Sequence, residues 1–386
     1  MLSSQQDPSL NNAELDPERQ EQAKEFARIQ RRFIFLDLGL GAALLLTWLV
    51  TGWSVELRDW IASWTTNPWL AVLAYGGIFG GVFTLLDLPL SFYTGYILPH
   101  QFNQSNQDLK GWLTDLVKGL LISVTLGGLV LEIIYFLLRT APETWWLWAA
   151  GFLLVFNVLL SNLAPVLLFP IFNKFTPLAQ EKQALRERLL ALAEKAGAPV
   201  MGVFRFDMSR RTKSANAGLT GLGNTRRIIL GDTLLDEFSP DEIETVLAHE
   251  LGHHANRDIP LGIAVGTVLT MGGLYLTALV LDWGINTFGF NSVSDLAALP
   301  LFAICLGVYS LLTSPLSNGY SRWRENLADE YALQLTGKGQ AYASALKRLS
   351  DQNLAEVDPP AWVEFFLHSH PALSKRIQRA ENYTTQ

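Results

Sequence analysis

The chain has 386 residues, of which 49% are hydrophobic and only 17% are charged. Soluble proteins carry about a quarter charged residues, so this composition favours a membrane protein. The formal net charge is −7, from 29 Lys+Arg against 36 Asp+Glu, which argues against electrostatic binding of nucleic acid. The one cysteine, Cys305, cannot form an intramolecular disulfide, which excludes a secreted disulfide framework.

Six apolar stretches are long enough to cross a bilayer, which takes about 20 residues per helix. They lie at residues 33–53, 69–92, 113–138, 145–169, 259–283 and 296–317. Most of the 12 Trp stand at the ends of these stretches, as interfacial aromatic residues do in membrane proteins. Buried core helices are the alternative interpretation, but one soluble core rarely needs six. The sequence therefore predicts an α-helical, multi-pass membrane protein in contact with the lipid bilayer.

The distribution of basic residues predicts how the chain is oriented. Arg28, Arg31 and Arg32 precede the first span, whereas the next connection holds only Arg58. Because cytoplasmic loops are enriched in Lys and Arg, the N-terminus is expected in the cytoplasm. Lys174 opens the large polar segment after the fourth span, so we expect this segment and the C-terminus to face the cytoplasm too. The expected location is the cell (inner) membrane, with the active site on its cytoplasmic side.

Three parts follow in chain order. Residues 1–30 are a polar tail without the apolar core of a secretory signal, and residues 31–170 hold four spans. Residues 171–386 form the predicted catalytic domain, interrupted by the spans at about 259–283 and 296–317.

Three acidic residues, Asp37, Asp87 and Glu132, lie within or near the ends of the spans. Intramembrane acids usually face a protein interior or a water-filled cavity, so they indicate a wet chamber. For Asp37 and Asp87, a position near the lipid headgroups explains the sequence equally well.

The polar segment after the fourth span has an α+β pattern. A helix is expected over residues 178–196, and strands over 203–206 and 227–230, joined by a segment rich in Ser, Asn and Gly. Ser239 and Glu242 form a predicted capping box with Pro240 at the first helical position, so a further helix begins here.

This further helix carries an HExxH pattern. His249 and His253 are four residues apart, so both imidazoles project from one face and can bind a single zinc ion. Glu250 lies beside them and can accept a proton from a water molecule. The pattern predicts one zinc ion per chain and needs a third ligand.

The best third ligand is a carboxylate in a second helical stretch. Glu325 and Asp329 are again four residues apart and share a face. Two His and one Glu leave the fourth zinc position open, as a catalytic site requires, and Asp329 would orient a ligand imidazole or assist proton transfer. In the alternative interpretation, both acids are solvated partners of Arg322 and Arg324.

Further short motifs accompany these two helices. They are Ser214-Ala215-Asn216-Ala217 with Gly221, His370-Pro371 with Arg376-Ile377, Leu88-Pro89-Leu90-Ser91 with Phe102-Asn103, and Phe172-Asn173-Lys174-Phe175-Thr176-Pro177-Leu178. Together they span most of the chain beyond about residue 30. On these residues, the chain resembles the type I CAAX prenyl proteases, which are integral-membrane zinc endopeptidases.

The resemblance implies a zincin-like (gluzincin) domain with His249, His253 and Glu325 as zinc ligands. Glu250 would be the general base, Asp329 the proton donor, and the helices would enclose a large chamber. Six spans instead of seven suggest a bacterial-type relative. Two substrate classes stay open: prenylated proteins that lose C-terminal residues, and damaged membrane proteins. A transporter or scaffold with a vestigial zinc site is the non-enzyme alternative, against which the intact Glu250 argues.

Two motifs have candidate roles in substrate binding and catalysis. Ser214, Ala215, Asn216 and Ala217 resemble the edge strand along which such proteases bind an extended peptide or protein substrate. An ordinary surface loop is the alternative. His370 and Arg376 could stabilise the oxyanion, or could instead belong to a helix start with a solvated face.

Overall fold

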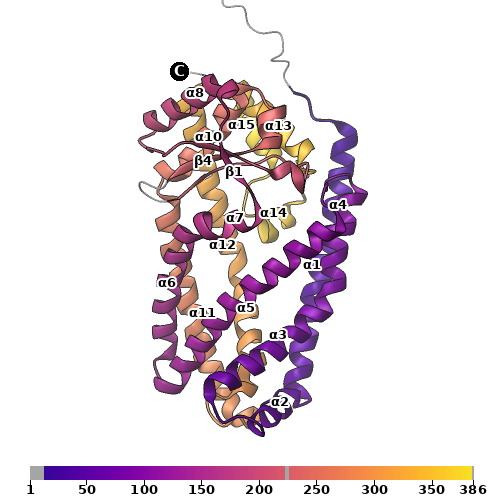
Figure 1. Ribbon diagram of the computed structural model, residues 1–386, viewed down its shortest axis with the longest axis vertical. Helices are drawn as coiled ribbons and strands as arrows, with labels where there is room; N and C mark the ends of the chain where they lie inside the picture. The colour runs from indigo at the N-terminus through magenta and orange to yellow at the C-terminus, as the bar shows by residue number, and fades with distance from the viewer. Residues whose placement is uncertain (1–12, 222–225, 385–386) are drawn as a thin grey trace, which may run out of the picture.

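The computed structural model describes residues 13–221 and 226–384. Within these residues, six helices are long and apolar enough to cross a membrane, which confirms the predicted fold class. They are Pro17–Val50, Pro68–Gln101, Leu109–Thr140, Trp145–Phe172, Asp258–Phe288 and Leu296–Thr336, counted with their short continuations. Figure 1 shows these helices as an elongated bundle, with a small sheet and shorter helices packed at one end.

The first four crossings belong to α1 to α7. The bounds are α1 Pro17–Val50, α2 Trp53–Ala62, α3 Pro68–Phe92, α4 Leu98–Gln101, α5 Leu109–Thr140, α6 Trp145–Leu163 and α7 Phe169–Phe172. Asp16, Asn67 and Asp108 accept hydrogen bonds from backbone N–H groups at the starts of α1, α3 and α5. These caps satisfy donors that a helix cannot pair itself, and so they fix where each long helix begins.

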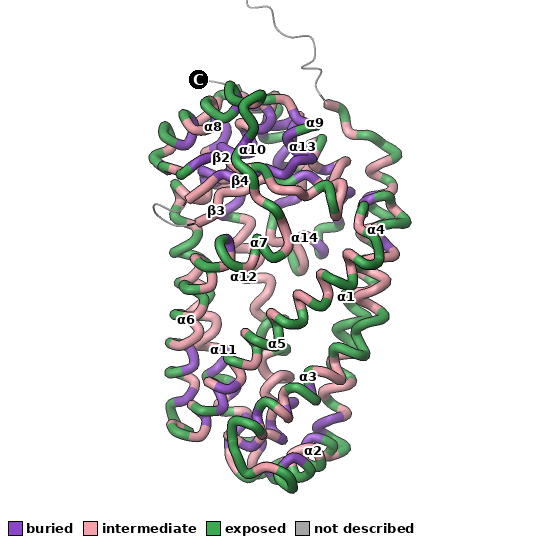
Figure 2. The backbone as a smooth tube through the Cα atoms, in the orientation of Figure 1, coloured by how far each residue is buried: buried purple, intermediate pink, exposed green. Residues whose placement is uncertain are grey.

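The surface of the bundle is apolar. Leu85, Val124 and Leu312 are each at least 70% exposed, although their side chains are apolar and contact with water is unfavourable for them. In Figure 2, exposed and intermediate residues predominate along the middle of these helices, whereas buried residues gather in the end domain and at the opposite end of the bundle. Lipid chains are the environment in which such side chains are stable, as expected for membrane spans.

The end domain contains a four-stranded sheet in the order β1-β2-β4-β3. The strands are β1 Phe175–Pro177, β2 Val203–Phe206, β3 Ala217–Thr220 and β4 Arg227–Gly231. β2 and β4 are parallel, whereas β1 and β3 are antiparallel to their neighbours. β2 has the predicted bounds and β4 is one residue longer, whereas β3 lies in the segment read as a connection. Because β3 comes last in the strand order, it forms one edge of the sheet.

Helices cover this sheet and carry the chain in and out of the membrane. The bounds are α8 Gln183–Lys195, α9 Asp232–Glu237, α10 Pro240–Ala255, α11 Asp258–Phe288, α12 Leu299–Thr336, α13 Gly339–Gln352, α14 Ala361–Leu367 and α15 Leu373–Glu381. α8 begins later than predicted because residues 180–182 form a 3₁₀ turn first. The predicted capping box of Ser239 and Glu242 is present at the start of α10. Buried side chains from α8, the sheet, α10 and α13 form the core beneath the site.

Candidate metal centre

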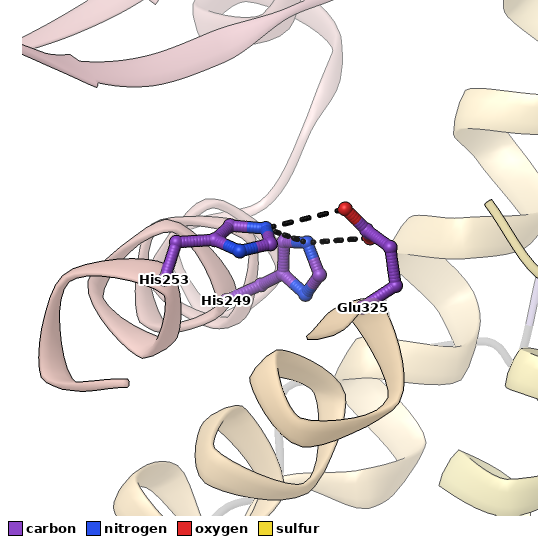
Figure 3. Close-up of side chains that lie close together, drawn as sticks. All are labelled: His249, His253 and Glu325. Atoms are coloured by element: carbon purple, nitrogen blue, oxygen red, sulfur yellow. Dashed lines mark hydrogen bonds and ion pairs between the residues drawn. The ribbon is translucent and has the colours of Figure 1, made fainter. Parts of the chain in front are cut away.

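The two histidines of the HExxH pattern lie on one face of α10. Their Nε2 atoms are 3.2 Å apart, and His249 is only 8% exposed. Figure 3 shows both rings pointing toward α12, where Glu325 faces them. Glu325 Oε2 is 3.3 Å from His249 Nε2, and Glu325 Oε1 is 3.4 Å from His253 Nε2.

A glycine makes this approach of α10 and α12 possible. Gly252 stands between the two histidines, and a Cβ built there would lie 2.9 Å from Ala328 Cα and 3.0 Å from Ala328 O. No side chain fits at such distances without moving one of the helices. The close contact between the two backbones therefore determines the distance between Glu325 and the imidazoles.

The spacing of the three ligand atoms fits zinc. Zinc binds nitrogen and oxygen at about 2.0–2.2 Å in tetrahedral geometry, which places ligand atoms about 3.3 Å apart. The two histidine Nε2 atoms are 3.2 Å apart, and each lies 3.3–3.4 Å from a different oxygen of the Glu325 carboxylate. Glu325 Oε2 is also buried without a hydrogen bond among the described residues. An unpaired buried carboxylate oxygen costs free energy that a bound cation would recover.

Three buried side chains form a hydrogen-bonded group at the Nδ1 side of His249, opposite its Nε2 atom. Its Nδ1 atom lies 2.9 Å from Asp329 Oδ1 and 3.1 Å from the Tyr342 hydroxyl. Tyr342 donates a hydrogen bond of 2.5 Å to Asp329 Oδ1, and Arg376 donates to both Asp329 oxygens at 2.6 and 2.9 Å. Burial raises the pKa of Tyr342, so its hydroxyl keeps the proton that it donates.

His253 has an equivalent partner that the sequence analysis did not identify. Asp258 Oδ2 lies 2.7 Å from His253 Nδ1, and Asp258 Oδ1 accepts a hydrogen bond of 2.6 Å from Arg324 Nε. Arg324 also contributes to a helix-to-helix link, because its Nη2 donates to Asn256 O at 2.5 Å. A carboxylate five positions after the second histidine is the sequence signal that could have revealed this contact.

The surroundings of His249 change its protonation. Burial disfavours the imidazolium, but the neighbouring carboxylates of Asp329 and Glu325 outweigh it and raise the pKa of His249 to about 9. A metal ion must displace this proton, so binding of the metal and of the proton compete.

The other predicted catalytic residues have different positions. His370 is exposed, and its Nε2 atom lies 3.2 Å from Glu325 Oε1. Arg376 is 8% exposed and engaged by Asp329, with its Nη1 atom 3.9 Å from Glu325 Oε2. Glu250 is half-buried and follows His249 in α10.

The predicted substrate-binding residues lie just before and at the start of the edge strand. Ala217 is the first residue of β3, and Asn216 O accepts a hydrogen bond of 2.8 Å from Gly231 N of β4. Ser214 O accepts a hydrogen bond from the Thr233 hydroxyl, and Ala215 is buried.

Comparisons with known proteins show the family of the chain. A model of peptidase family M48 matches residues 179–384, and one described as the CAAX prenyl protease N-terminal domain, with five membrane helices, matches residues 1–174. An uncharacterized metalloprotease, YhfN, of Bacillus subtilis is 31% identical over 93% of this chain and 84% of its own. CAAX prenyl protease 1 of Saccharomyces cerevisiae is 32% identical over 79% of this chain and 71% of its own.

A solved structure is similar over almost the whole length. The crystal structure of S. mikatae Ste24p superposes with a TM-score of 0.86 at 27% identity, covering 99% of this chain and 93% of that one. The arrangement of the long helices and the end domain is thus similar to that of a solved structure over nearly the whole chain. The chain belongs to peptidase family M48 and is a multi-pass membrane metallopeptidase.

Proposed function

We propose that this metallopeptidase is a zinc-dependent endopeptidase with His249, His253 and Glu325 as the ligands of one zinc ion. The observation that carries the proposal is the convergence of three side chains: the two histidine Nε2 atoms are 3.2 Å apart, and each is 3.3–3.4 Å from an oxygen of Glu325, distances that a small adjustment around one zinc ion can use. Within the described residues, the possible metal cluster consists of these three side chains. The fourth position is then open to water or substrate, as in a catalytic site.

Glu250 is the proposed general base. When bound, zinc lowers the pKa of a water molecule and polarises the peptide carbonyl. The Glu250 carboxylate accepts a proton as the water oxygen attacks the carbonyl carbon, and it transfers a proton to the leaving nitrogen as the C–N bond breaks. His370 is exposed beside Glu325 and is our candidate for donating a hydrogen bond to the oxyanion.

Asp329 and Arg376 act through His249 in this proposal. Both are buried, and Asp329 accepts hydrogen bonds from Arg376 and Tyr342 while facing His249 Nδ1. A carboxylate on the far nitrogen of a metal-binding imidazole fixes the ring orientation and tautomer. We therefore assign positioning roles to Asp329 and Arg376, in place of proton donation and direct contact with the oxyanion.

The proposed substrates are extended peptide segments close to the membrane. β3 is the edge of the sheet and half-buried, so a peptide can add to it through backbone hydrogen bonds. Relatives named CAAX prenyl protease 1 support substrates that carry a lipid near the C-terminus. Exposed aromatic side chains at Trp362, Phe365 and Phe366 of α14 provide apolar surface a few residues before His370.

The test uses purified protein in detergent or lipid, loaded with zinc. Wild type should bind one zinc per chain and cleave peptides that end in a lipidated segment. Glu250→Gln should keep the zinc and lose the activity, because Glu250 is a base and not a ligand. Glu325→Ala should lose most of the zinc, because two histidines alone leave the ion underligated.

The two variants are controls for each other. Equal loss of zinc in both would contradict the separate roles of Glu250 and Glu325. Cleavage of the same peptides without a lipid, at the same kcat/KM, would contradict the lipidated substrate while leaving the protease assignment standing.

A further inference from the structure

The connection between α13 and α14 contacts the segment that leads into the edge strand. Gln352 Nε2 donates a hydrogen bond of 2.9 Å to Lys213 O, and Gln104 Nε2 donates one of 3.0 Å to Gln352 O. Asn353 follows and contacts Ala215 twice. Its Oδ1 accepts from Ala215 N at 2.8 Å, and its Nδ2 donates to Ala215 O at 3.1 Å.

The Asn353 side chain replaces a neighbouring strand at this point. A carboxamide offers one acceptor and two donors in a plane, much like a peptide group. Two residues that lie opposite each other in a hydrogen-bonded pair of antiparallel strands form the same two bonds: the N–H of each donates to the C=O of the other. Ala215 therefore has the hydrogen bonds of a paired strand residue, although the partner is a single side chain.

This contact lies on the edge of the sheet where β3 has no neighbouring strand among residues 13–221 and 226–384. Gly231 N of β4 donates to Asn216 O, so the backbone of Asn216 faces β4. Backbone groups alternate in direction along a strand, and hence those of Ala215 and Ala217 point away from β4. Asn353 thus covers the edge at Ala215, and β3 continues it from Ala217 onward.

The position of Asn353 is fixed by its neighbours. Leu354 adopts a left-handed conformation with φ of 48° and is 3% exposed, which turns the chain sharply after α13. Asp351 accepts hydrogen bonds from Gln20 Nε2 at 2.7 Å and from Asp16 N at 2.9 Å, at the start of α1. The connection is therefore anchored to α1 on one side and to Ala215 on the other.

We propose that Asn353 is a positioning residue that holds the edge strand in register for substrate and ends the open edge at Ala215. The inference rests on the proposed function, in which an extended peptide adds to β3. Ala217 N already donates to Asn216 Oδ1 at 2.8 Å, so a bound peptide can form backbone hydrogen bonds from the Ala217 carbonyl onward but meets the Asn353 carboxamide at Ala215. Asn353 therefore limits how many substrate residues pair on that side of the cleaved bond.

The test compares Asn353→Ala with wild type on peptides lengthened one residue at a time at either end. Loss of two hydrogen bonds at the strand should raise KM by about 5- to 30-fold, with kcat and bound zinc close to wild type. A residue that reaches Ala215 should add nothing to kcat/KM in wild type but should increase it in Asn353→Ala. Asn353→Asp retains the acceptor for Ala215 N and should be intermediate in KM.

Gln352→Ala is the matched control. It removes the neighbouring side-chain amide, which donates a hydrogen bond to Lys213 O and makes none to Ala215. An equal rise of KM in this control, or a lowered melting temperature with unchanged KM in Asn353→Ala, would overturn the inference. The proposed function survives that outcome if wild type still cleaves and Glu250→Gln does not. A wild type that cleaves no peptide would overturn both.

Discussion

Each imidazole at the metal centre contacts a carboxylate with its second nitrogen. His249 Nδ1 faces Asp329 Oδ1 at 2.9 Å, and His253 Nδ1 faces Asp258 Oδ2 at 2.7 Å. In both cases the Nε2 atom is left to face Glu325, because the carboxylate selects the tautomer with hydrogen on Nδ1. Each carboxylate in turn accepts hydrogen bonds from an arginine, Arg376 or Arg324, which hold it in place.

Asp258→Asn tests this arrangement at His253. The amide oxygen can still accept the Nδ1 hydrogen, but the negative charge and the full ion pair with Arg324 are lost. We expect zinc affinity or activity to fall by about 10- to 100-fold, as changes next to a metal-binding histidine commonly do. Chelator competition and peptide cleavage measure the two quantities. Asp236→Asn changes an acid with a largely exposed side chain and should match wild type; equal losses in both variants would contradict a role of Asp258 at the metal.

At the scale of elements, the site depends on the contact between α10 and α12. Gly252 allows this contact because its missing Cβ leaves 2.9 Å to Ala328 Cα. Glu325 lies one turn before Ala328 in α12, and His249 and His253 flank Gly252 in α10. A small change in helix separation therefore acts on all three metal ligands together.

Gly252→Ala should push α10 and α12 apart. Overpacking of this kind costs about 1–3 kcal/mol, and the separation should weaken zinc binding as well. Zinc titration and thermal unfolding in detergent measure both effects. Gly266→Ala in α11 is the control, because a Cβ there meets nothing within 4 Å. Wild-type zinc affinity in Gly252→Ala would show that the helices can adjust without moving the ligands.

The start of α10 is fixed by two basic side chains, one from α8 and one from the residue just before α13. Lys338 Nζ lies 2.8 Å from Asp241 Oδ1 and also bonds Glu244, which accepts a further hydrogen bond of 2.8 Å from Arg188 Nε of α8. Burial alone would raise the pKa of both acids, but the hydrogen bonds from Lys338 and Arg188 outweigh it and lower the pKa of Asp241 and Glu244. Because folding lowers these pKa values, the acids stabilise the fold above their unfolded pKa, near 4, and this contribution is lost as pH falls through their folded pKa.

Lys338→Met should therefore destabilise the protein at neutral pH and have little effect in acid. At pH 7, we expect a loss of about 1 kcal/mol, because the partly exposed ion pair is screened by solvent. The difference from wild type should shrink as the pH is lowered toward about 3, where both acids become protonated. Thermal unfolding across this pH range measures it. A difference that stays constant with pH would assign the effect to packing of the lysine side chain.

Local sequence patterns predicted those features of the site in which all the residues belong to the same helix. The HExxH spacing, the capping box of Ser239 and the pairing of Glu325 with Asp329 on one face follow from helical periodicity. Tyr342 escaped the sequence analysis because it is 93 positions from His249 and reaches it only through the packing of α13 on α10. β1 has three residues, too few for an alternating pattern, and is defined by its pairing with β2.

At the scale of the whole molecule, the ends of the spans determine from which side substrate arrives. α10 and the polar half of α12 both continue into spans, α11 and the apolar half of α12, so the metal centre lies at one end of the bundle (Figure 1). The basic residues Arg28, Arg31 and Arg32 of α1 lie toward the same end, where Arg31 forms an ion pair of 2.7 Å with Glu356. The positive-inside rule predicts that this end is cytoplasmic.

Labelling of introduced cysteines tests this orientation. In a Cys305→Ala background, cysteines at Thr66 and Glu143 occupy exposed connections at the end of the bundle away from the metal centre. Both should react with a membrane-impermeant thiol reagent added to intact cells, because one span precedes Thr66 and three precede Glu143, which puts both connections on the side opposite the N-terminus. A cysteine at the exposed Asn382, after α15, should react only once the membrane is opened. Labelling of Asn382→Cys in intact cells would instead place the metal centre outside, and substrates would then have to reach it from the external face of the membrane.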